Sequence, residues 1–257
     1  MELASRRGRN DWIVAAVPAA AILLTWEVAA AATRARYGVP GPSHVLITWG
    51  RMIADGSLLA DINVSLRRIL VGFAIGSALG YTAGLLLGNF RALRRFCDPY
   101  IHFSRYVPPI SLISLAVILF GIGENSKVFL IVYTATFMVL LNTIAGVHAI
   151  PTNRMRAARS FGAGTFQLFT HVIVPSSVSH AITGMRIAMG NAFATIVVAE
   201  MLAARSGVGF LIYNSYQYLD IDKILIGIFT LGLLGYLADL AMRRLDRSLA
   251  RFRPLGF

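Results

Sequence analysis

Long apolar runs, separated by shorter polar intervals, make up most of this sequence. Several runs reach about 20 residues, the length that a helix needs to cross the hydrocarbon core of a bilayer. The pattern therefore predicts an all-α, polytopic membrane protein with about six transmembrane helices in a single domain, residues 1–257. The expected helices are Trp12–Thr33, Val64–Gly88, a short helix that begins at Pro108, Val128–Ile150, Ala181–Ala204 and Ile224–Met242.

Composition supports the membrane class. The chain is 56% hydrophobic and only 14% charged, which is too apolar for an ordinary soluble domain. Its formal charge of +12 does not indicate nucleic acid, because no basic stripe with interleaved aromatic residues is present. The arginines instead flank the apolar runs, and most fall on the side that holds both termini and residues 151–175. Because basic loops stay in the cytoplasm, both termini are predicted to be cytoplasmic.

The N-terminal part predicts one spanning helix and one surface helix. Trp12–Thr33 is longer than the roughly 7–15 apolar residues of a cleaved signal peptide, so we expect a retained helix. Glu27 inside it is expected near the outer helix end and facing water. Beyond the helix breakers Gly38–Pro42, Ser43 is predicted to cap an amphipathic helix that lies at the membrane surface.

The second predicted helix carries a row of glycines at steps of four residues. Small residues at this spacing let two helix backbones approach closely in lipid. The row drifts by about 40° per step, so we expect it to wind around the helix and to serve more than one neighbour. Arg67 and Arg68, at the outer end, either reach out to the membrane surface or attract an anion at a pore mouth. The glycines are Gly72, Gly76, Gly80, Gly84 and Gly88.

The fifth predicted helix places polar side chains within an apolar run. Asn191 and Thr195 share one face, and Glu200 is expected close to that face. Polar groups are costly in hydrocarbon, so the face should turn away from lipid. These residues form either an internal hydrogen-bond cluster that holds helices together or the wall of a translocation path, and the two roles are compatible.

The segment Pro151–Pro175 is the only long polar interval in the second half of the chain. It predicts two short helices, Arg154–Phe161 and Thr165–His171, about a hinge that contains Gly162 and Gly164. A simple connection between neighbouring helices is usually shorter. The segment is therefore either an ordinary loop between membrane helices or a surface built to dock onto a partner.

Spacing within this segment resembles the coupling loop of ABC importer permeases. The matching positions are Ala157-Ala158, Gly162-Ala163, Phe169, Val172, Val174 and Pro175. In that family the loop sits in a groove of the cytoplasmic ATPase. One position departs from the pattern, because Arg156 stands where the family has a glutamate. The resemblance thus implies a partner ATPase with an acidic or polar rim at that point.

Two further stretches resemble the sulfonate, nitrate and taurine branch of these permeases: RYVPPISLISLAVILFGIGENSKVFLI and GVGFLI. The resemblance implies a type I ABC importer permease fold in the bacterial inner membrane, assembled as a homodimer. It implies two cytoplasmic ABC ATPase subunits that carry ATP and Mg, and an extracytoplasmic solute-binding protein. The expected substrate is a small anionic or zwitterionic solute such as a sulfonate, taurine, nitrate or bicarbonate.

The chain shows no pattern for chemistry of its own. It lacks the P-loop pattern and the H-E-x-x-H pattern, and its five histidines are scattered. The single cysteine, Cys97, excludes an internal disulfide and a multi-cysteine metal site. We therefore expect no catalytic residues, no metal and no cofactor on this chain. The alternative to an importer subunit is a secondary transporter or channel that works alone and follows an ion gradient.

Overall fold

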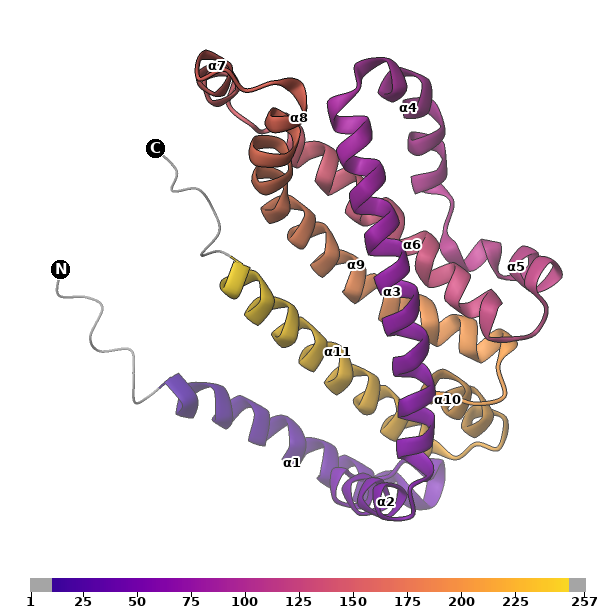
Figure 1. The fold of residues 1–257 in the computed structure, drawn as a ribbon. Helices are drawn as coiled ribbons and strands as arrows, with labels where there is room; N and C mark the ends of the chain where they lie inside the picture. The colour runs from indigo at the N-terminus through magenta and orange to yellow at the C-terminus, as the bar shows by residue number, and fades with distance from the viewer. Residues whose placement is uncertain (1–10, 250–257) are drawn as a thin grey trace.

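The computed structural model describes residues 11–249, without the side chains of residues 11–16, 33–37 and 249. Within this range the chain is built from helices and short connections, and no strand occurs (Figure 1). The elements are α1 (Asp11–Tyr37), α2 (Pro42–Ala54), α3 (Ser57–Asn89), α4 (Arg91–Tyr106), η1 (Pro109–Leu112), α5 (Ile113–Phe120), α6 (Glu124–His148), α7 (Thr152–Ser160), α8 (Thr165–Leu168), η2 (Phe169–Ile173), α9 (Val174–Ala203), α10 (Val208–Gln217) and α11 (Ile221–Leu249).

Four helices are long and apolar enough to cross a membrane, which confirms the predicted all-α membrane class. They are Ser57–Asn89, Glu124–His148, Thr165–Ala203 and Ile221–Ser248. A fifth span results if α4 and the η1–α5 segment, bent by 92°, are counted together. The described part of α1 adds a shorter apolar stretch, Val17–Ala32. The expected six spans are therefore reached only when both of these are included.

The region before Pro108 contains a helix that is absent from the expected set. Residues 91–106 form the 16-residue helix α4. The clustered arginines of this stretch resemble a polar loop, although its apolar and polar residues follow the period of an amphipathic helix. The bend that follows has a local cause, because Pro108 and Pro109 lack backbone N–H groups and Val107, before a proline, adopts an extended conformation.

The start of α2 also differs from its prediction. The N-cap is Gly41, and Ser43 lies inside the first turn. The hydroxyl and backbone N–H of Ser43 donate to the Glu27 carboxylate at 2.7 and 3.1 Å. A Cβ at Gly41 would lie 2.6 Å from the same carboxylate. Glu27 is therefore half-buried and fastens α2 to α1, instead of simply facing water.

The glycine row of α3 serves one neighbour, so the expectation of several was wrong. A Cβ added at any of the five glycines would lie within 2.5–2.8 Å of an atom of α6. The nearest side chains include Ile131, Ala135, Thr143 and Val147, which also recur at steps of four. Rows of this spacing run obliquely to a helix axis, and the two helices cross obliquely so that their rows coincide (Figure 1). Because α3 and α6 cross at an angle, the glycine row of α3 stays against α6 although it winds around its own helix axis.

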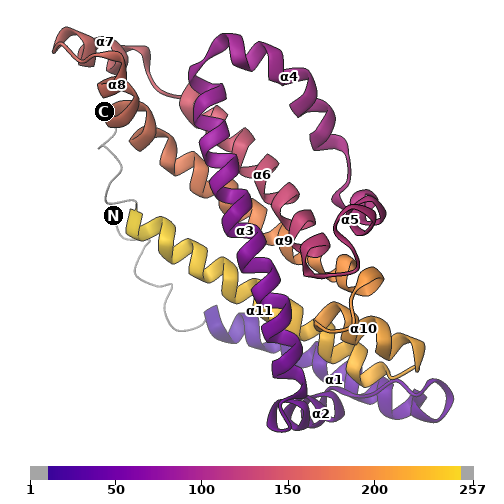
Figure 2. The ribbon, with the colours of Figure 1, turned by 45° about the vertical axis from the view of Figure 1, so that its right-hand side comes forward.

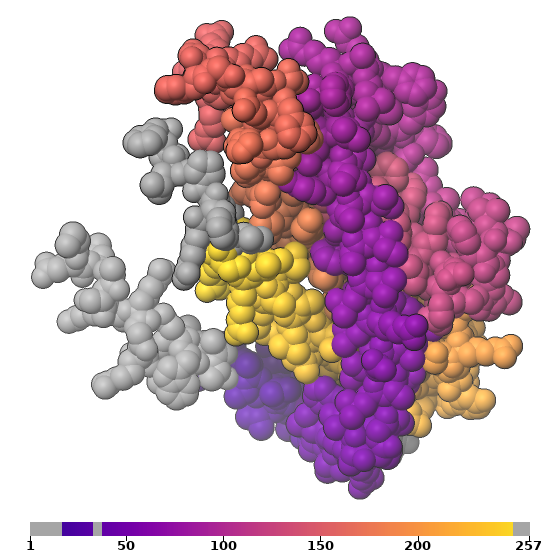
Figure 3. Space-filling model, viewed as in Figure 1, coloured from indigo at the N-terminus to yellow at the C-terminus, as the bar shows by residue number. Residues whose placement is uncertain are grey.

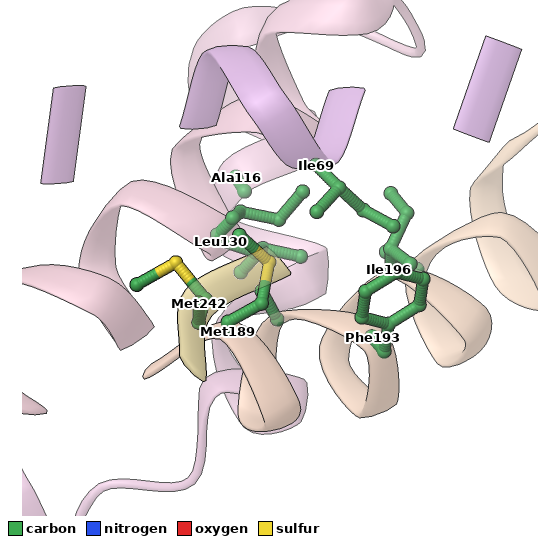
Figure 4. Packing of buried hydrophobic residues seen from close by; sticks show 10 residues of the cluster. Ile69, Ala116, Leu130, Met189, Phe193, Ile196 and Met242 are labelled. Atoms are coloured by element: carbon green, nitrogen blue, oxygen red, sulfur yellow. The ribbon is translucent and has the colours of Figure 1, made fainter. Parts of the chain in front are cut away.

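The main core lies where α3, α6 and α9 meet. Ile69, Leu130, Phe193 and Ile196 are at least 92% buried there, and Met242 of α11 closes the cluster (Figure 4). Helices α7 and α8 lie at one end of the molecule, and α2 and α10 lie at the other, in both ribbon views (Figures 1 and 2). The core therefore connects two ends that carry different short helices.

Candidate functional site

The segment between α6 and α9 forms the predicted pair of short helices. Its first helix ends in a Schellman motif, in which the Ala163 N–H donates to the Ala158 carbonyl and the Gly162 N–H donates to the Arg159 carbonyl. Gly162 has φ +82°, which a glycine adopts without strain. This confirms Gly162 as the bend. It also explains the spacing of the sequence motif, because Ala158 and Ala163 are the two ends of the capping bond.

The second half of the segment is more continuous than predicted. Residues Thr165–Ala203 form one helical stretch, in which α8 passes through the π-helical turn η2 into α9. Pro175 lacks an N–H and its ring crowds the preceding turn, which accounts for the wider turn just before it. We had expected separate helices ending at His171 and beginning at Ala181. Because the helix does not break, no loop separates α8 from α9.

The segment is anchored from one side. Leu168 and Ile173 are each 4% exposed, and Phe169 packs against the cluster of Leu85 and Val147 at the ends of α3 and α6. Phe169 thus faces the membrane helices of its own chain. Arg154 adds a hydrogen bond of 3.3 Å from its side chain to the Ser176 hydroxyl.

The other side of the segment is uncovered. Phe161 is 92% exposed and Phe166 is 78% exposed. These residues stand in the segment that projects at one end of the space-filling view (Figure 3). Of the predicted coupling residues, Arg156, Ala157, Gly162 and Pro175 are exposed, and Ala158, Ala163 and Phe169 are half-buried. Both aromatic side chains are thus left uncovered by the described part of the chain.

At the opposite end, a buried charge cluster joins three helices. Arg68 of α3 is 3% exposed, and its guanidinium lies 2.8 Å from the carboxylate of Glu200, which is fully buried. The same guanidinium holds both oxygens of Glu124 on α6 and donates to the Ser206 carbonyl at 2.8 Å. Ser65 donates to Glu200 at 2.9 Å. Arginine is suited to such a site because its planar fork can satisfy two carboxylates at once.

Two glycines let the chain close over this cluster. Gly207 has φ +111°, and a Cβ there would lie 2.5 Å from the Glu200 carboxylate. Its N–H donates to Asp61 at 2.8 Å, and the Gly209 N–H donates to Glu200 at 2.9 Å. A Cβ at Gly209 would lie 2.5 Å from the Val197 carbonyl. The motif GVGFLI is therefore the turn that seats α10 on α9.

The predicted pathway residues do not form one surface. Arg68 and Glu200 come together, but as a buried ion pair, so the expectation of a charge exposed at a pore mouth applies only to Arg67. Thr195 is buried and lies 3.2 Å from Thr134 of α6, which ties the two helices together. Asn191 is exposed and donates to the Ile187 carbonyl of its own helix.

Glu200 lies away from the Asn191 face because nine residues of an α-helix turn it by about half a revolution. Our expectation that Glu200 lies close in angle was wrong for this reason. Four further residues of these two regions were not predicted from the sequence: Phe161, Phe166, Glu124 and Ser65. The two phenylalanines gave a signal, since aromatic residues are unusual in a polar interval. The partners of Arg68 gave none, because they are far apart in sequence.

No group of three or more His, Cys, Asp or Glu side chains that could hold a metal ion occurs among the residues with described side chains. The two features that stand out among the described residues are the exposed segment at one end and the charge cluster around Arg68 at the other.

Comparisons with known proteins identify the family. The family described as binding-protein-dependent transport system inner membrane component matches residues 76–251. A probable ABC transporter permease of Brucella abortus is 37% identical, over 84% of this chain and 86% of the relative. The taurine transport system permease of Escherichia coli is 34% identical, over 96% and 94%. A chain of the inward-facing MetNI methionine ABC transporter has the same fold, with a TM-score of 0.66 at 20% identity, and covers 75% of this chain and 95% of that one. The chain therefore belongs to the family of inner membrane components of binding-protein-dependent transport systems.

Proposed function

We propose that this chain is the permease subunit of an ATP-driven importer for a small sulfonate-like anion or zwitterion. Two copies would form the translocation path between them, with two cytoplasmic ATPase subunits below and a solute-binding protein outside. ATP and Mg would be bound by the ATPase subunits. The observation that carries the proposal concerns residues Pro151–Pro175, named the coupling segment below. This segment is exposed on one side, anchored on the other and continuous with α9.

Coupling would follow from this geometry. Phe161 and Phe166 would enter the groove of the ATPase, since buried aromatic anchors supply much of the energy of protein interfaces. Closure of the two ATPase subunits on ATP would move α8. Because α8, η2 and α9 form one helical stretch, α9 would tilt with it. A membrane part with inward-open and outward-open states would then be biased by nucleotide.

The substrate class is proposed from the relatives. The similarity to the taurine permease covers nearly the whole chain and favours a small solute with a sulfonate or comparable group. Arg67 would raise the local concentration of such an anion at the outer mouth. Asn191 would offer a neutral hydrogen-bonding group in the path, weak enough for release. This requires the exposed face of Asn191 to line the interface between two copies.

Retention of the ATPase tests the coupling segment. The complex would be purified in detergent with Phe161→Ala, Phe166→Ala and, as a matched control, Phe103→Ala, another phenylalanine that is 74% exposed but lies on α4. Loss of an aromatic anchor costs at least about 2 kcal/mol, so the first two variants should bind the ATPase about 30-fold more weakly. The control should retain it. Equal retention by all three would reject the coupling surface.

Gly162→Pro provides a second test of the same segment. Proline cannot adopt the positive φ of Gly162 and lacks the N–H that closes the Schellman motif, so the docking face should tilt. The variant should insert into the membrane and melt close to wild type but lose the ATPase. Normal retention of the ATPase with full ATP-driven transport by this variant would reject this segment as the docking surface. Transport by the wild type that follows an ion gradient without ATP would favour the stand-alone transporter.

Orientation is tested separately. Both termini and the coupling segment are proposed to be cytoplasmic, and Tyr216 on α10 is proposed to be external. A cytoplasm-specific reporter fused after Phe257 should be active, and the same reporter inserted near Tyr216 should be inactive. The reverse pattern would invert the topology and place the coupling segment out of reach of a cytoplasmic ATPase.

A further inference from the structure

A basic pocket lies at the end of the molecule that carries the coupling segment, but on different helices. It has a volume of about 560 Å³ and lies where α3 ends, α4 begins and α6 ends. These segments come together at the top of Figure 1. The lining residues are Leu87, Gly88, Asn89, Arg91, Arg94, Arg95, Asp98 and His148. The volume falls in the range of small-ligand sites.

The charge of this pocket is only partly balanced. Arg94 lies 3.4 Å from the Asp98 carboxylate and 2.7 Å from the ring of His148, which fixes its guanidinium at the wall. Arg91 and Arg95 are exposed, and neither forms an ion pair or a hydrogen bond through its side chain to the described residues. Three guanidinium groups therefore share one carboxylate. A bound group with several oxygens and negative charge would complete the arrangement.

The helix that supplies the arginines also carries an exposed aromatic face. At about 100° per residue, Arg91, Arg95 and Asp98 lie on one side of α4, and Phe96, Tyr100 and Phe103 lie on the other. These three aromatic side chains are 64–74% exposed in the structure. Aromatic side chains of this exposure are suited to contact with the bilayer and its interface. The arginines of the first two turns then lie at the membrane–water boundary, at the depth of the lipid headgroups.

We propose that this pocket binds the phosphodiester headgroup of an anionic phospholipid, phosphatidylglycerol in the test below. The phosphate oxygens would bind between Arg91 and Arg95, with Arg94 behind them. Basic pockets between membrane helices on the cytoplasmic side recognise such headgroups. The site is distinct from the coupling segment, and the proposal does not depend on the identity of the transported solute.

Native mass spectrometry of the delipidated, detergent-solubilised transporter tests the site. The protein would be incubated with equal amounts of phosphatidylglycerol and phosphatidylcholine, and one phosphatidylglycerol should be retained per permease chain. The double variant Arg91→Gln/Arg95→Gln removes two cations near the headgroup and should weaken this binding about 30-fold. Arg105→Gln removes a single cation from the other end of α4 and should leave phosphatidylglycerol binding unchanged. Equal retention of both lipids would overturn the proposal.

A variant that should strengthen lipid binding distinguishes loss of headgroup recognition from general damage to the fold. Asp98→Asn removes the one carboxylate of the pocket, so phosphatidylglycerol should bind several-fold more tightly. Weaker binding by this variant would contradict the charge argument. Inorganic phosphate at the same concentration as the lipid should not displace it, and displacement would identify a free-anion site in place of a lipid site. Loss of the ATPase from the double variant with unchanged lipid binding would assign the arginines to a protein contact and also overturn the proposal.

Discussion

The two ends of this permease differ in which kind of side chain they bury: one end exposes large apolar side chains, and the other buries charged ones. At one end the coupling segment leaves Phe161 92% exposed, although burial of a phenylalanine is favourable. At the other end the chain buries Arg68 and Glu200 almost completely, although burial of charges is costly. An apolar surface left open can gain a partner. A charge pair closed within one subunit resists separation, because either charge alone in that position would be destabilising.

The difference indicates how the subunit can move without coming apart. The buried cluster joins α3, α6 and α9 by hydrogen bonds at the point where α10 begins. The coupling end has the exposed surface and the continuous connection to α9. A force applied at the coupling segment is thus received by a helix whose far end is fixed by hydrogen bonds and an ion pair.

The largest expected effect comes from breaking the buried pair. Arg68→Ala removes the ion-pair partner of the fully buried Glu200 and should destabilise the fold by about 3–5 kcal/mol. Its neighbour Arg67 is exposed, so Arg67→Ala should change stability by less than about 0.5 kcal/mol. Thermal melting of the purified chain in detergent measures both. Equal melting temperatures would show that the cluster does not hold these three helices together.

The next effect concerns the contact that joins the two ends. A Cβ at Gly80 would lie 2.5 Å from the backbone carbonyl of Thr136, which cannot move without shifting α6. Gly80→Ala should therefore destabilise by about 1–3 kcal/mol, the usual cost of overpacking. Gly190→Ala on α9 meets open space and should be neutral or stabilising by up to about 1 kcal/mol. The same melting assay compares them, and a larger loss at Gly190 would contradict the α3–α6 packing.

The smallest effect on stability is expected at Asn191. Its side chain is exposed and bonds only to its own helix, so Asn191→Leu should leave assembly and basal ATP hydrolysis largely unchanged while lowering transport. Thr195→Val, one turn further along, removes a buried hydrogen bond to Thr134 and should cost about 0.6 kcal/mol. Solute uptake in proteoliposomes, together with melting, measures both. Unchanged uptake by Asn191→Leu would remove this residue from the proposed path.

Sequence reasoning was most successful where the structure depends on local backbone chemistry. The apolar runs predict the membrane helices because their length and composition are local properties. Gly162 was predictable as the bend because a positive φ at a helix end needs glycine. The failures at Ser43 and at α4 are also local in origin. A serine can bond to a distant carboxylate in place of its own helix end, and an arginine-rich helix resembles a polar loop.

What only the tertiary structure decided is which residues far apart in sequence meet. The sequence placed Arg68 and Glu200 at helix ends, but their separation of 132 residues carries no information about contact. It showed five glycines at steps of four, but the inclination that directs all five to α6 depends on the matching row of that helix. Pro175 is a residue that usually interrupts a helix. The π-helical turn that keeps α8 and α9 continuous in spite of it is a property of the folded backbone. Local sequence fixes the helices and their bends, whereas the pairing of buried charges and helix rows requires the whole chain to be folded, because each partner is selected by the burial of the other.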